Sequence, residues 1–317
     1  MSSSLLSVVV ATRDTRDLTL ACLESVRAVE PAAELILIDD GGCDGTREAV
    51  AERFPDARVL RNAEPQGFTA SANRGLGVST GGLLLLLNSD TVLLAGSTSA
   101  LRRAFEEDDG LGVAGGALRY PGGQPQWSGG RAPSLSWLFA LASGLPRALE
   151  RLPGYRRGRP VSGTAAGEVV EWVTGAALAM RREVWERVGP LDESFRFYAQ
   201  DLDLCLRARD TGWRTRIVPG FQVIHHHGAT IGRMRESVRR QHPELLWSDL
   251  LRWARKRRGP IWARRAARAI LWGGRLRVAL RSIRRPFLPW AEREAWRCDT
   301  LSYRHALAAI AEETVDL

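Results

Sequence analysis

The sequence has few cysteines and no long apolar run. Its four cysteines are unevenly spaced and form no CxxC pair. This spacing excludes a disulfide framework and a cysteine-based zinc site, and it predicts reduced thiols in a cytosolic compartment. No apolar stretch approaches the roughly 18 residues of a membrane-spanning helix, and the first residues lack the charged region and apolar core of a signal peptide. We therefore expect a cytoplasmic protein that does not cross a membrane, although it can lie on a membrane surface.

Internal repeats and low-complexity tracts are also missing from the sequence. With 44% hydrophobic and 26% charged residues, the composition is that of a globular protein. A chain of 317 residues can bury a full core in one large domain or in two. The net charge of +9 is unevenly distributed, because residues 231–290 carry 17 arginines or lysines and only three acidic residues. The basic character therefore belongs to the C-terminal segment, and the remainder is slightly acidic.

The first half of the sequence alternates between strand-like and helix-like segments. Four apolar runs are typical of strands, and three intervening segments have helical periodicity: 6–11, 34–38, 57–61 and 83–87, with 18–29, 46–53 and 70–78 between them. This rhythm predicts an α/β protein with a doubly wound, mostly parallel sheet. Residues 110–167 are rich in glycine, proline and serine and predict long loops over a substrate groove. Regular structure is expected again from 169 to about 228, followed by a basic helical extension.

Three groups of polar residues follow predicted strands or begin a helix. Five leucines at 83–87 precede Asn88-Ser89-Asp90, and an acidic residue at the carboxyl end of a buried strand is well placed to hold a divalent cation against a phosphate. Asp201 stands near the start of a helix, and the strand from Phe221 ends in three histidines that begin at His225. Imidazole also binds divalent metals.

Each of these groups also has a purely structural interpretation. The Asn88–Asp90 triplet can be an ordinary polar turn, and the histidines can be a chance polar turn. Asp201 can be an N-cap that stabilises its helix by about 1 kcal/mol. Asp203, two residues further on, is better explained as solvent-facing or structural.

Taken together and in order, these residues resemble the inverting family 2 glycosyltransferases with the GT-A fold. The resemblance covers residues 6–232 and rests on six elements in register. They are the opening SVVVATRDTRDLTLACLESV, the turn LIDDGGCDGT, the element NAEPQGFTASANRG, the strand end LLLLNSD, the segment VTGAALAMRREVWERVGPLD, and the acidic helix with the later VIH strand. The most similar subgroup is the bacterial rhamnosyltransferase-like set that builds cell-surface polysaccharides.

The resemblance implies a role for each matching residue. Thr12 and Asp39 would contact the nucleotide base, since a carboxylate accepts the imide proton of uracil or thymine. The nucleotide-sugar site as a whole would comprise Thr12, Asp39, Gly67, Asn73, Ser89 and Asp90. Asn73 would lie near the ribose and diphosphate, and Gly67 and Gly75 would keep the backbone close to them.

The same resemblance implies the catalytic and acceptor-side residues. Asp90 and His225 would hold Mg²⁺ or Mn²⁺ against the diphosphate, and Asp201 would be the general base. Acceptor-side contacts would come from Trp172, Gly175 and Gln200. Two departures from the family pattern stand out. Asn88 replaces the first aspartate of the metal triplet, and Gln200 replaces the glutamate that usually precedes the base.

The implied organisation is a GT-A catalytic domain over residues 1–230 and a basic helical region over 231–317. A nucleotide-sugar half would span about 1–110, and an acceptor half about 111–230. The implied reaction is metal-dependent transfer of a sugar, best matched by rhamnose from dTDP-rhamnose, to a glycan or polyprenyl-linked acceptor. A UDP-sugar-dependent galactofuranosyl- or hexosyltransferase is the alternative, and a non-catalytic glycan- or nucleic-acid-binding protein is a remote one. A sugar-phosphate nucleotidyltransferase is excluded, because Ala11–Thr15 takes the place of its glycine-rich loop.

The basic C-terminal region predicts a membrane-surface helix. From Pro260 the sequence carries an apolar stripe whose members are Trp262, Ala266, Ala269, Gly273, Leu276, Leu280 and Ile283, with arginines mostly on other faces. This pattern favours peripheral attachment to an anionic membrane, here the inner face of the cytoplasmic membrane. Packing of an arginine-rich helix on the catalytic domain is the alternative. Nucleic-acid binding is disfavoured because no nucleic-acid module accompanies the charge.

Overall fold

The computed structural model describes residues 5–145, 161–162, 169–226 and 242–315. These residues fall into two compact units. The first comprises those within Met1–Arg131, Pro160–Arg196 and Gln200–Arg233, and the second those within Ala132–Arg159, Phe197–Ala199 and Met234–Leu317. The described part of the segment 132–159, expected in the acceptor half, is thus grouped with the C-terminal helices.

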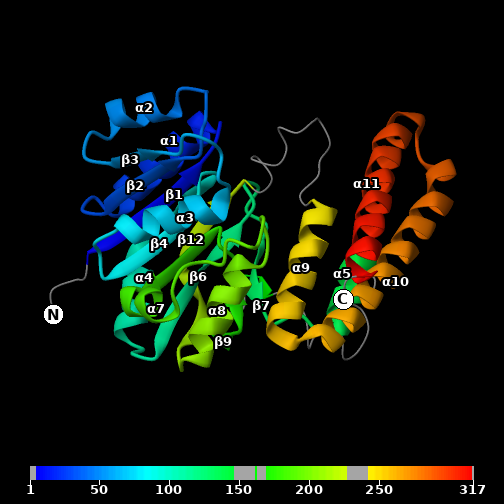
Figure 1. The fold of residues 1–317 in the computed structure, drawn as a ribbon. Helices are drawn as coiled ribbons and strands as arrows, with labels where there is room; N and C mark the ends of the chain where they lie inside the picture. The colour runs from blue at the N-terminus through cyan, green and yellow to red at the C-terminus, as the bar shows by residue number, and fades with distance from the viewer. Residues whose placement is uncertain (1–4, 146–160, 163–168, 227–241, 316–317) are drawn as a thin grey trace. The chain divides into compact units, whose positions relative to one another are not determined.

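A twisted sheet runs through the first unit (Figure 1). Its strands are β1 (Leu6–Thr12), β2 (Glu34–Asp39), β3 (Arg58–Arg61), β4 (Leu83–Asn88), β5 (Thr91–Leu93), β6 (Leu111–Arg119), β9 (Val169–Val170), β11 (Ala177–Arg181) and β12 (Arg214–His225). The order is β3-β2-β1-β4-β11-β6-β12-β5, with β9 also paired to β12. Strands β1, β2, β3, β4, β6 and β12 share one direction, and β5, β9 and β11 run against it. The predicted α/β fold with a mostly parallel sheet is confirmed.

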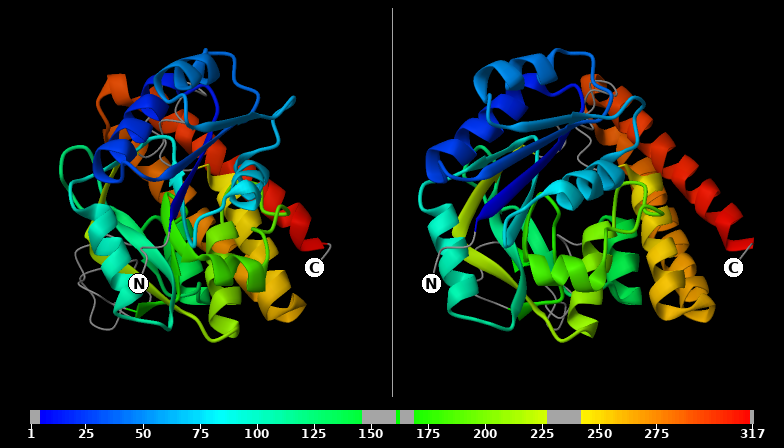
Figure 2. Two further views of the ribbon diagram at one scale, coloured as in Figure 1. Left: turned by 90° about the vertical axis from the view of Figure 1, so that its left-hand side faces the viewer. Right: turned by 60° about the vertical axis from the view of Figure 1, so that its left-hand side comes forward.

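Helices cover both faces of this sheet (Figure 2). They are α1 (Arg16–Val29), α2 (Thr46–Arg53), α3 (Phe68–Val78), α4 (Ser97–Glu106), α7 (Arg182–Val188) and α8 (Gln200–Asp210). Alternation along β1 separates the two faces. Val8 and Val10 join the core formed with α1, α2 and α4, whereas Val9 faces α3. Gly75 allows that contact, since a Cβ there would lie 2.3 Å from Val9 Cγ1.

We expected long loops over residues 110–167, and this expectation was wrong for the first residues of that range. Residues 111–119 form β6, a buried strand in the middle of the sheet. Its glycines led to the prediction of a loop. In the structure their missing side chains allow larger side chains to pack against the strand. A Cβ at Gly112 would lie 2.6 Å from Trp213 Cβ, and one at Gly115 would lie 2.5 Å from Val173 Cγ1. A small second sheet follows, of β7 (Trp127–Gly130), β8 (Val161–Ser162) and β10 (Trp172–Val173).

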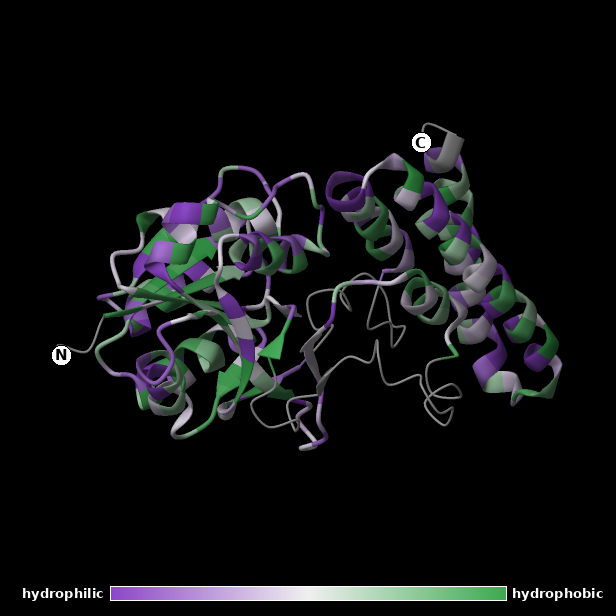
Figure 3. Ribbon diagram, turned by 90° about the horizontal axis from the view of Figure 1, so that it is seen from below, coloured by the Kyte–Doolittle hydropathy of each residue, from purple (hydrophilic) through white to green (hydrophobic). Residues whose placement is uncertain are grey.

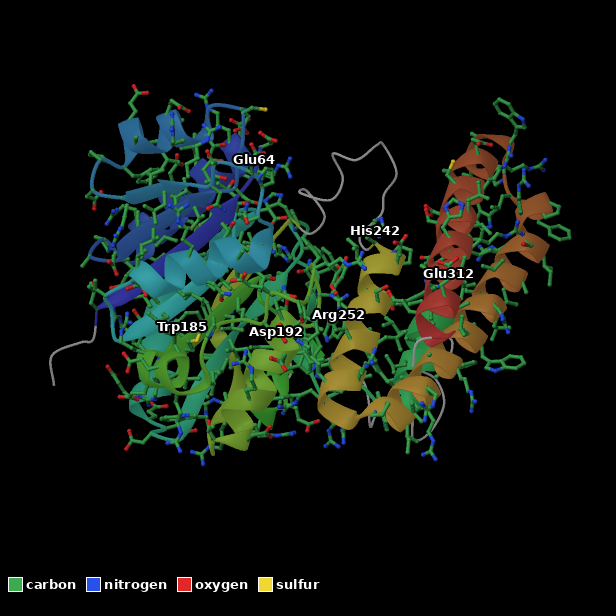
Figure 4. All side chains as sticks on the ribbon, in the orientation of Figure 1. Glu64, Trp185, Asp192, His242, Arg252 and Glu312 are labelled. Atoms are coloured by element: carbon green, nitrogen blue, oxygen red, sulfur yellow. The ribbon has the colours of Figure 1, made fainter. Side chains whose placement is uncertain are left out.

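The second unit consists of helices. They are α5 (Leu135–Ser143), α9 (Pro243–Arg258), α10 (Pro260–Arg284), the 3₁₀ turn η3 (Arg285–Phe287) and α11 (Trp290–Val315). His242 lies at the start of α9 and Glu312 near the end of α11 (Figure 4). The core of this unit contains Trp247, Trp253, Ala263, Ala266, Ala267, Ile270, Ala306 and Ile310. No helix of the described residues is long and apolar enough to span a membrane.

The apolar stripe expected on α10 divides into two parts in the structure. Ala266 and Gly273 are buried, and a Cβ at Gly273 would lie 2.5 Å from the carbonyl oxygen of Phe139 in α5. Leu280 and Ile283, at the other end of the stripe, are exposed. The first part of the stripe is therefore a helix-packing surface within the second unit. Coloured by hydropathy, the sheet strands are mostly green and the C-terminal helices mix purple with green (Figure 3).

Candidate active site at the carboxyl edge of the sheet

The shared direction of six strands gathers the predicted donor-side residues at one edge of the sheet. Thr12 pairs with Asp39 at the ends of β1 and β2, and Ala11 pairs with Asn88 at the end of β4. His225 ends β12 and pairs with Thr91 across the adjoining antiparallel strand. This is the edge at which ligands bind in open α/β sheets.

Asp90 and His225 face each other at this edge. Both are buried, and Asp90 Oδ1 lies 3.3 Å from His225 Nε2. The backbone fixes the pair as well, because the His226 N–H donates to the Asp90 carbonyl oxygen at 2.9 Å. The amide Nδ2 of Asn88 lies 3.4 Å from the same imidazole nitrogen. The structure thus brings the two predicted metal-binding residues together.

Gln126 orients the imidazole of His225. Its Nε2 donates to the His225 carbonyl oxygen at 3.4 Å, so its Oε1 faces His225 Nδ1, at 2.6 Å. With this amide orientation Nδ1 donates to Gln126, and the ring is held with Nε2 facing Asp90. Gln126 is buried and follows a proline-rich turn, where no local sequence pattern pointed to it. Only the fold reveals its role.

The Asp90–His225 pair suits a divalent cation. Two acceptor atoms 3.3 Å apart match the separation of neighbouring ligands in an octahedral site, which is about 3 Å for Mg²⁺. No group of three or more His, Cys, Asp or Glu residues that could enclose a metal occurs among the described residues. Among the described residues, Asp90 and His225 would hold the cation, and Mg²⁺ is commonly bound by one or two protein ligands together with substrate phosphates.

Asp39 and Thr12 are buried beside each other, but their side chains have different partners. Asp39 Oδ1 accepts the Gly42 N–H at 2.8 Å, and a Cβ at Gly42 would come equally close to that oxygen. The Thr12 hydroxyl joins a buried cluster with Thr15 and Thr19 at 2.8 and 2.7 Å. Ser89 belongs to the same cluster, since its hydroxyl lies 2.9 Å from that of Thr15. These hydroxyl contacts connect the end of β1, the start of α1 and the turn after β4. The sequence did not predict them.

The loop before α3 is held by Asp40. Its carboxylate accepts hydrogen bonds from the Asn62 amide at 2.7 Å, the Gln66 N–H at 2.7 Å and the Gly67 N–H at 2.9 Å, and also from Ser71. Burial by itself raises the pKa of Asp40, but these hydrogen bonds outweigh it and hold the pKa below its ordinary value. Gly67 adopts φ +88°, and the space around its missing Cβ is open. The Asp40 carboxylate therefore fixes the conformation of the loop before α3.

Asn73 and Gly75 have packing partners in the structure. The Asn73 amide donates to the Leu191 carbonyl and to Glu193, and its oxygen accepts the Leu191 N–H at 2.9 Å. Asn73 thus ties α3 to the loop before α8. Gly75 lies against Val9, so its missing side chain serves helix–sheet packing.

Asp201 lies in the first turn of α8, where the helix dipole favours negative charge. Its Oδ2 accepts the Gly175 N–H and its Oδ1 accepts the Leu202 N–H, both at 2.8 Å. Burial is the largest influence and raises the pKa of Asp201 above its ordinary value, even though these bonds act to lower it. A carboxylate with a raised pKa is a stronger proton acceptor.

Backbone bonds link this carboxylate to the donor side of the edge. The Asn88 N–H donates to the Ala176 carbonyl oxygen at 3.0 Å, and the preceding residue, Gly175, donates to Asp201. Of the other acceptor-side candidates, Trp172 donates its indole N–H to the Arg131 carbonyl at 3.0 Å, and Gln200 is buried at the start of α8. The two halves of the candidate site therefore meet between the end of β4 and the start of β11.

Asp203 has a structural role. It is buried and accepts a hydrogen bond from Arg207 Nε at 2.7 Å, while the same guanidinium donates to the carbonyls of Val188 and Pro190. The cysteines are all free. Burial raises the pKa of Cys22 and of Cys205 to about 12, so these thiols are not nucleophiles at neutral pH.

Comparisons with known proteins define the class. A mannosyltransferase from Pyrobaculum calidifontis, solved with GDP-Man and Mn²⁺, has a TM-score of 0.56 at 17% identity, over 99% of this chain and 88% of that one. GalNAc-T7, solved with UDP, GalNAc and Mn²⁺, has a TM-score of 0.59 at 16% identity, over 98% of this chain and 57% of that one. The fold is thus of the GT-A type.

The sequence comparisons give the family. The model of glycosyl transferase family 2 matches residues 7–168, and that of glycosyl transferase family group 2 matches residues 159–304. The chain belongs to glycosyl transferase family 2. An N-acetylglucosaminyl-diphospho-decaprenol L-rhamnosyltransferase of Mycobacterium tuberculosis is 29% identical over 65% of this chain and 70% of its own length. The rhamnosyltransferase WbbL of Escherichia coli is 39% identical over 19% of this chain and 23% of its own length.

Proposed function

We propose that the chain is a metal-dependent inverting glycosyltransferase that moves rhamnose from dTDP-rhamnose to a glycan or polyprenyl-linked acceptor in cell-surface polysaccharide synthesis. Membership of family 2 supports a nucleotide-sugar donor. The names of two relatives, both rhamnosyltransferases, support the sugar, and one of them supports a decaprenyl-linked acceptor. The observation that carries the proposal is the backbone link from the Asp90 turn through Ala176 and Gly175 to Asp201.

On the donor side, Asp39 and Thr12 would border the nucleotide base. Gly67, Asn73 and Ser89 complete the proposed nucleotide-sugar site, and Asp90 and His225 would hold Mg²⁺ or Mn²⁺. When bound, such a cation stabilises the negative charge on the departing diphosphate as a Lewis acid. Gln126 would hold the ring so that His225 Nε2 can bind the cation beside Asp90.

On the acceptor side, Asp201 would take the proton of the attacking hydroxyl. Its raised pKa suits this task, because it makes the carboxylate a stronger base than an exposed aspartate. The new bond to the anomeric carbon forms as the bond to the diphosphate breaks on the opposite face. One base and one displacement give inversion without a covalent sugar–enzyme intermediate. Trp172, Gly175 and Gln200 would shape the acceptor side.

A UDP-sugar donor, for a galactofuranosyl- or hexosyltransferase, is the second candidate. The Asp39 carboxylate favours neither base over the other, since uracil and thymine present the same imide N–H. We further propose that the enzyme is peripheral on the inner face of the cytoplasmic membrane, where a polyprenyl-linked acceptor would lie.

A donor screen tests these assignments. The purified chain is incubated with dTDP-rhamnose and with UDP-sugars, each with Mg²⁺ and after exhaustive chelation, and nucleoside diphosphate release is measured. We expect release from dTDP-rhamnose that chelation abolishes and Mg²⁺ or Mn²⁺ restores. Release from a UDP-sugar alone would select the second candidate. Full activity after chelation would overturn the metal assignment and leave the Asp90–His225 pair a structural contact.

A further inference from the structure

The join between α10 and α11 exposes a group of large apolar side chains. We call residues Ile283–Trp290 the hairpin tip, which is at the upper right of Figure 1. Ile283 is 66% exposed, Phe287 83% and Trp290 86%. They occupy the end of α10, the turn η3 and the start of α11, so three apolar side chains lie within eight residues. Large apolar side chains grouped on a surface commonly mark a binding site.

This exposure is maintained by contacts at the base of the hairpin tip. Arg293 donates to the Leu288 and Pro286 carbonyls, both at 2.9 Å, and so holds the turn closed. The Trp296 indole N–H donates to the Arg281 carbonyl at 2.9 Å, and the Arg281 guanidinium lies 3.7 Å from the Trp296 ring centroid. These contacts join α10 to α11 just below the turn. The hairpin tip is therefore an ordered turn with its apolar side chains directed outward.

The α10 side of the hairpin tip is basic. Residues 252–285 contain 13 arginines or lysines and no aspartate or glutamate. Arg265, Arg268, Arg275 and Arg285 are exposed along α10 and η3. Trp272, 65% exposed, lies on the same helix with the Arg275 guanidinium 6.0 Å from its ring centroid. Exposed aromatic rings among arginines are the combination that suits the boundary between lipid headgroups and acyl chains.

We infer that the hairpin tip docks the chain on a bilayer of anionic phospholipid, with Phe287 and Trp290 entering the interface and the arginines of α10 contacting the headgroups. Charge complementarity selects this partner, because the 34-residue basic stretch repels cationic surfaces and attracts anionic ones. A nucleic acid would use the arginines but would leave Ile283 and Phe287 in water. Only the purpose of docking, access to a lipid-linked acceptor, rests on the proposed function.

Vesicle sedimentation with the full chain tests this inference in the absence of any sugar donor. Vesicles of phosphatidylcholine are compared with equimolar phosphatidylcholine and phosphatidylglycerol, at low and high salt. We expect binding to the anionic vesicles that high salt weakens, since screening shortens the range of surface charge to about 3 Å at 1 M. The Phe287→Ser/Trp290→Ser variant should bind them about tenfold more weakly or worse, and Arg285→Gln several-fold more weakly.

Two matched variants show whether these losses are specific. Val169→Ser changes an exposed apolar residue of the first unit, and Arg103→Gln changes an exposed arginine of α4. Both should bind like the wild type. All four variants should keep the wild-type unfolding temperature and nucleoside diphosphate release, so a failed docking result is distinguishable from a failed enzyme assignment.

Three outcomes would overturn the inference. If the wild-type chain did not sediment with anionic vesicles at low salt, it would have no such docking surface. Equal binding by the wild type and Phe287→Ser/Trp290→Ser would show that the hairpin tip takes no part. Light scattering that shows an oligomer dissociated by the same double variant, with vesicle binding unchanged, would make the hairpin tip a contact between copies of the chain.

Discussion

His225 and Gln126 are 99 residues apart in the sequence, yet the imidazole Nδ1 lies 2.6 Å from the amide Oε1. This contact leaves the other ring nitrogen facing Asp90. A hydrogen-bond acceptor on the second ring nitrogen is a common arrangement behind metal-binding histidines, and the Gln126 amide oxygen occupies that position here.

Replacing Gln126 by leucine should therefore weaken metal binding. His225 would lose the acceptor for its Nδ1 proton, and the ring would no longer be held with Nε2 toward Asp90. We expect the Mn²⁺ affinity, measured by calorimetry in the presence of nucleoside diphosphate, to fall roughly 10–100-fold. Gln126→Glu keeps an acceptor oxygen and should retain most of the affinity. If Gln126→Leu bound Mn²⁺ with the wild-type affinity, the amide would be only a packing group.

Replacing Asp201 by asparagine should separate binding from turnover. The side chain keeps its size and can still accept the Gly175 N–H, so donor binding should be nearly unchanged. Turnover should fall by roughly the 10²–10⁴-fold typical of a lost general base. Stopped-flow binding and nucleoside diphosphate release measure the two effects separately. Near-wild-type turnover would move the base elsewhere, with Asp203 the next carboxylate to test.

The pH dependence of the reaction should report the same carboxylate. Burial raises the pKa of Asp201, so its ionised form is lost at a higher pH than for an exposed aspartate. Because the base must be ionised to accept a proton, kcat/KM should fall on the acid side through this raised pKa. Asp201→Asn should lack that limb in its residual activity. An identical acid limb in the variant would assign the titration to another group.

Asp40 should contribute stability that depends on pH. Its folded pKa is depressed by four hydrogen bonds, so the stabilisation is fully present above the unfolded pKa of an aspartate and is lost as pH falls through the folded pKa. Asp40→Asn should lower the free energy of unfolding at neutral pH by about 2 kcal/mol. Urea unfolding should show this difference shrinking below about pH 4. A difference that is constant down to acid pH would mean that charge plays no part.

The parts of the site that the sequence predicted are those with a local signal. Five leucines followed by Asn88-Ser89-Asp90 predict a buried strand with polar residues at its carboxyl end, and β4 comprises these leucines and Asn88. His225 likewise ends an apolar run. Strands in one direction bring such ends to one edge, but the Asp90–His225 contact also needs β5, which was not predicted and in which Thr91 pairs with His225.

The parts that the sequence missed depend on distant contacts. Gln126 has no neighbouring pattern, because its partner is brought to it by β12. The glycines of β6 suggested a loop, since the Trp213 and Val173 side chains that fill their space lie far along the chain. The exposed Leu280 and Ile283 could not be separated from the packed Ala266 and Gly273, because the apolar stripe gives no sign of which members other helices cover.

The anomeric configuration of the product tests most directly whether Asp201 acts as a single base in one displacement. The donor that the screen selects is reacted with a polyprenyl-linked or soluble glycan acceptor in the presence of Mg²⁺, and NMR follows the anomeric proton of the initial product. We predict a configuration opposite to that of the donor, with product formation suppressed in Asp201→Asn. A retained configuration would contradict the account, because it requires a second displacement for which Asp201 alone does not suffice.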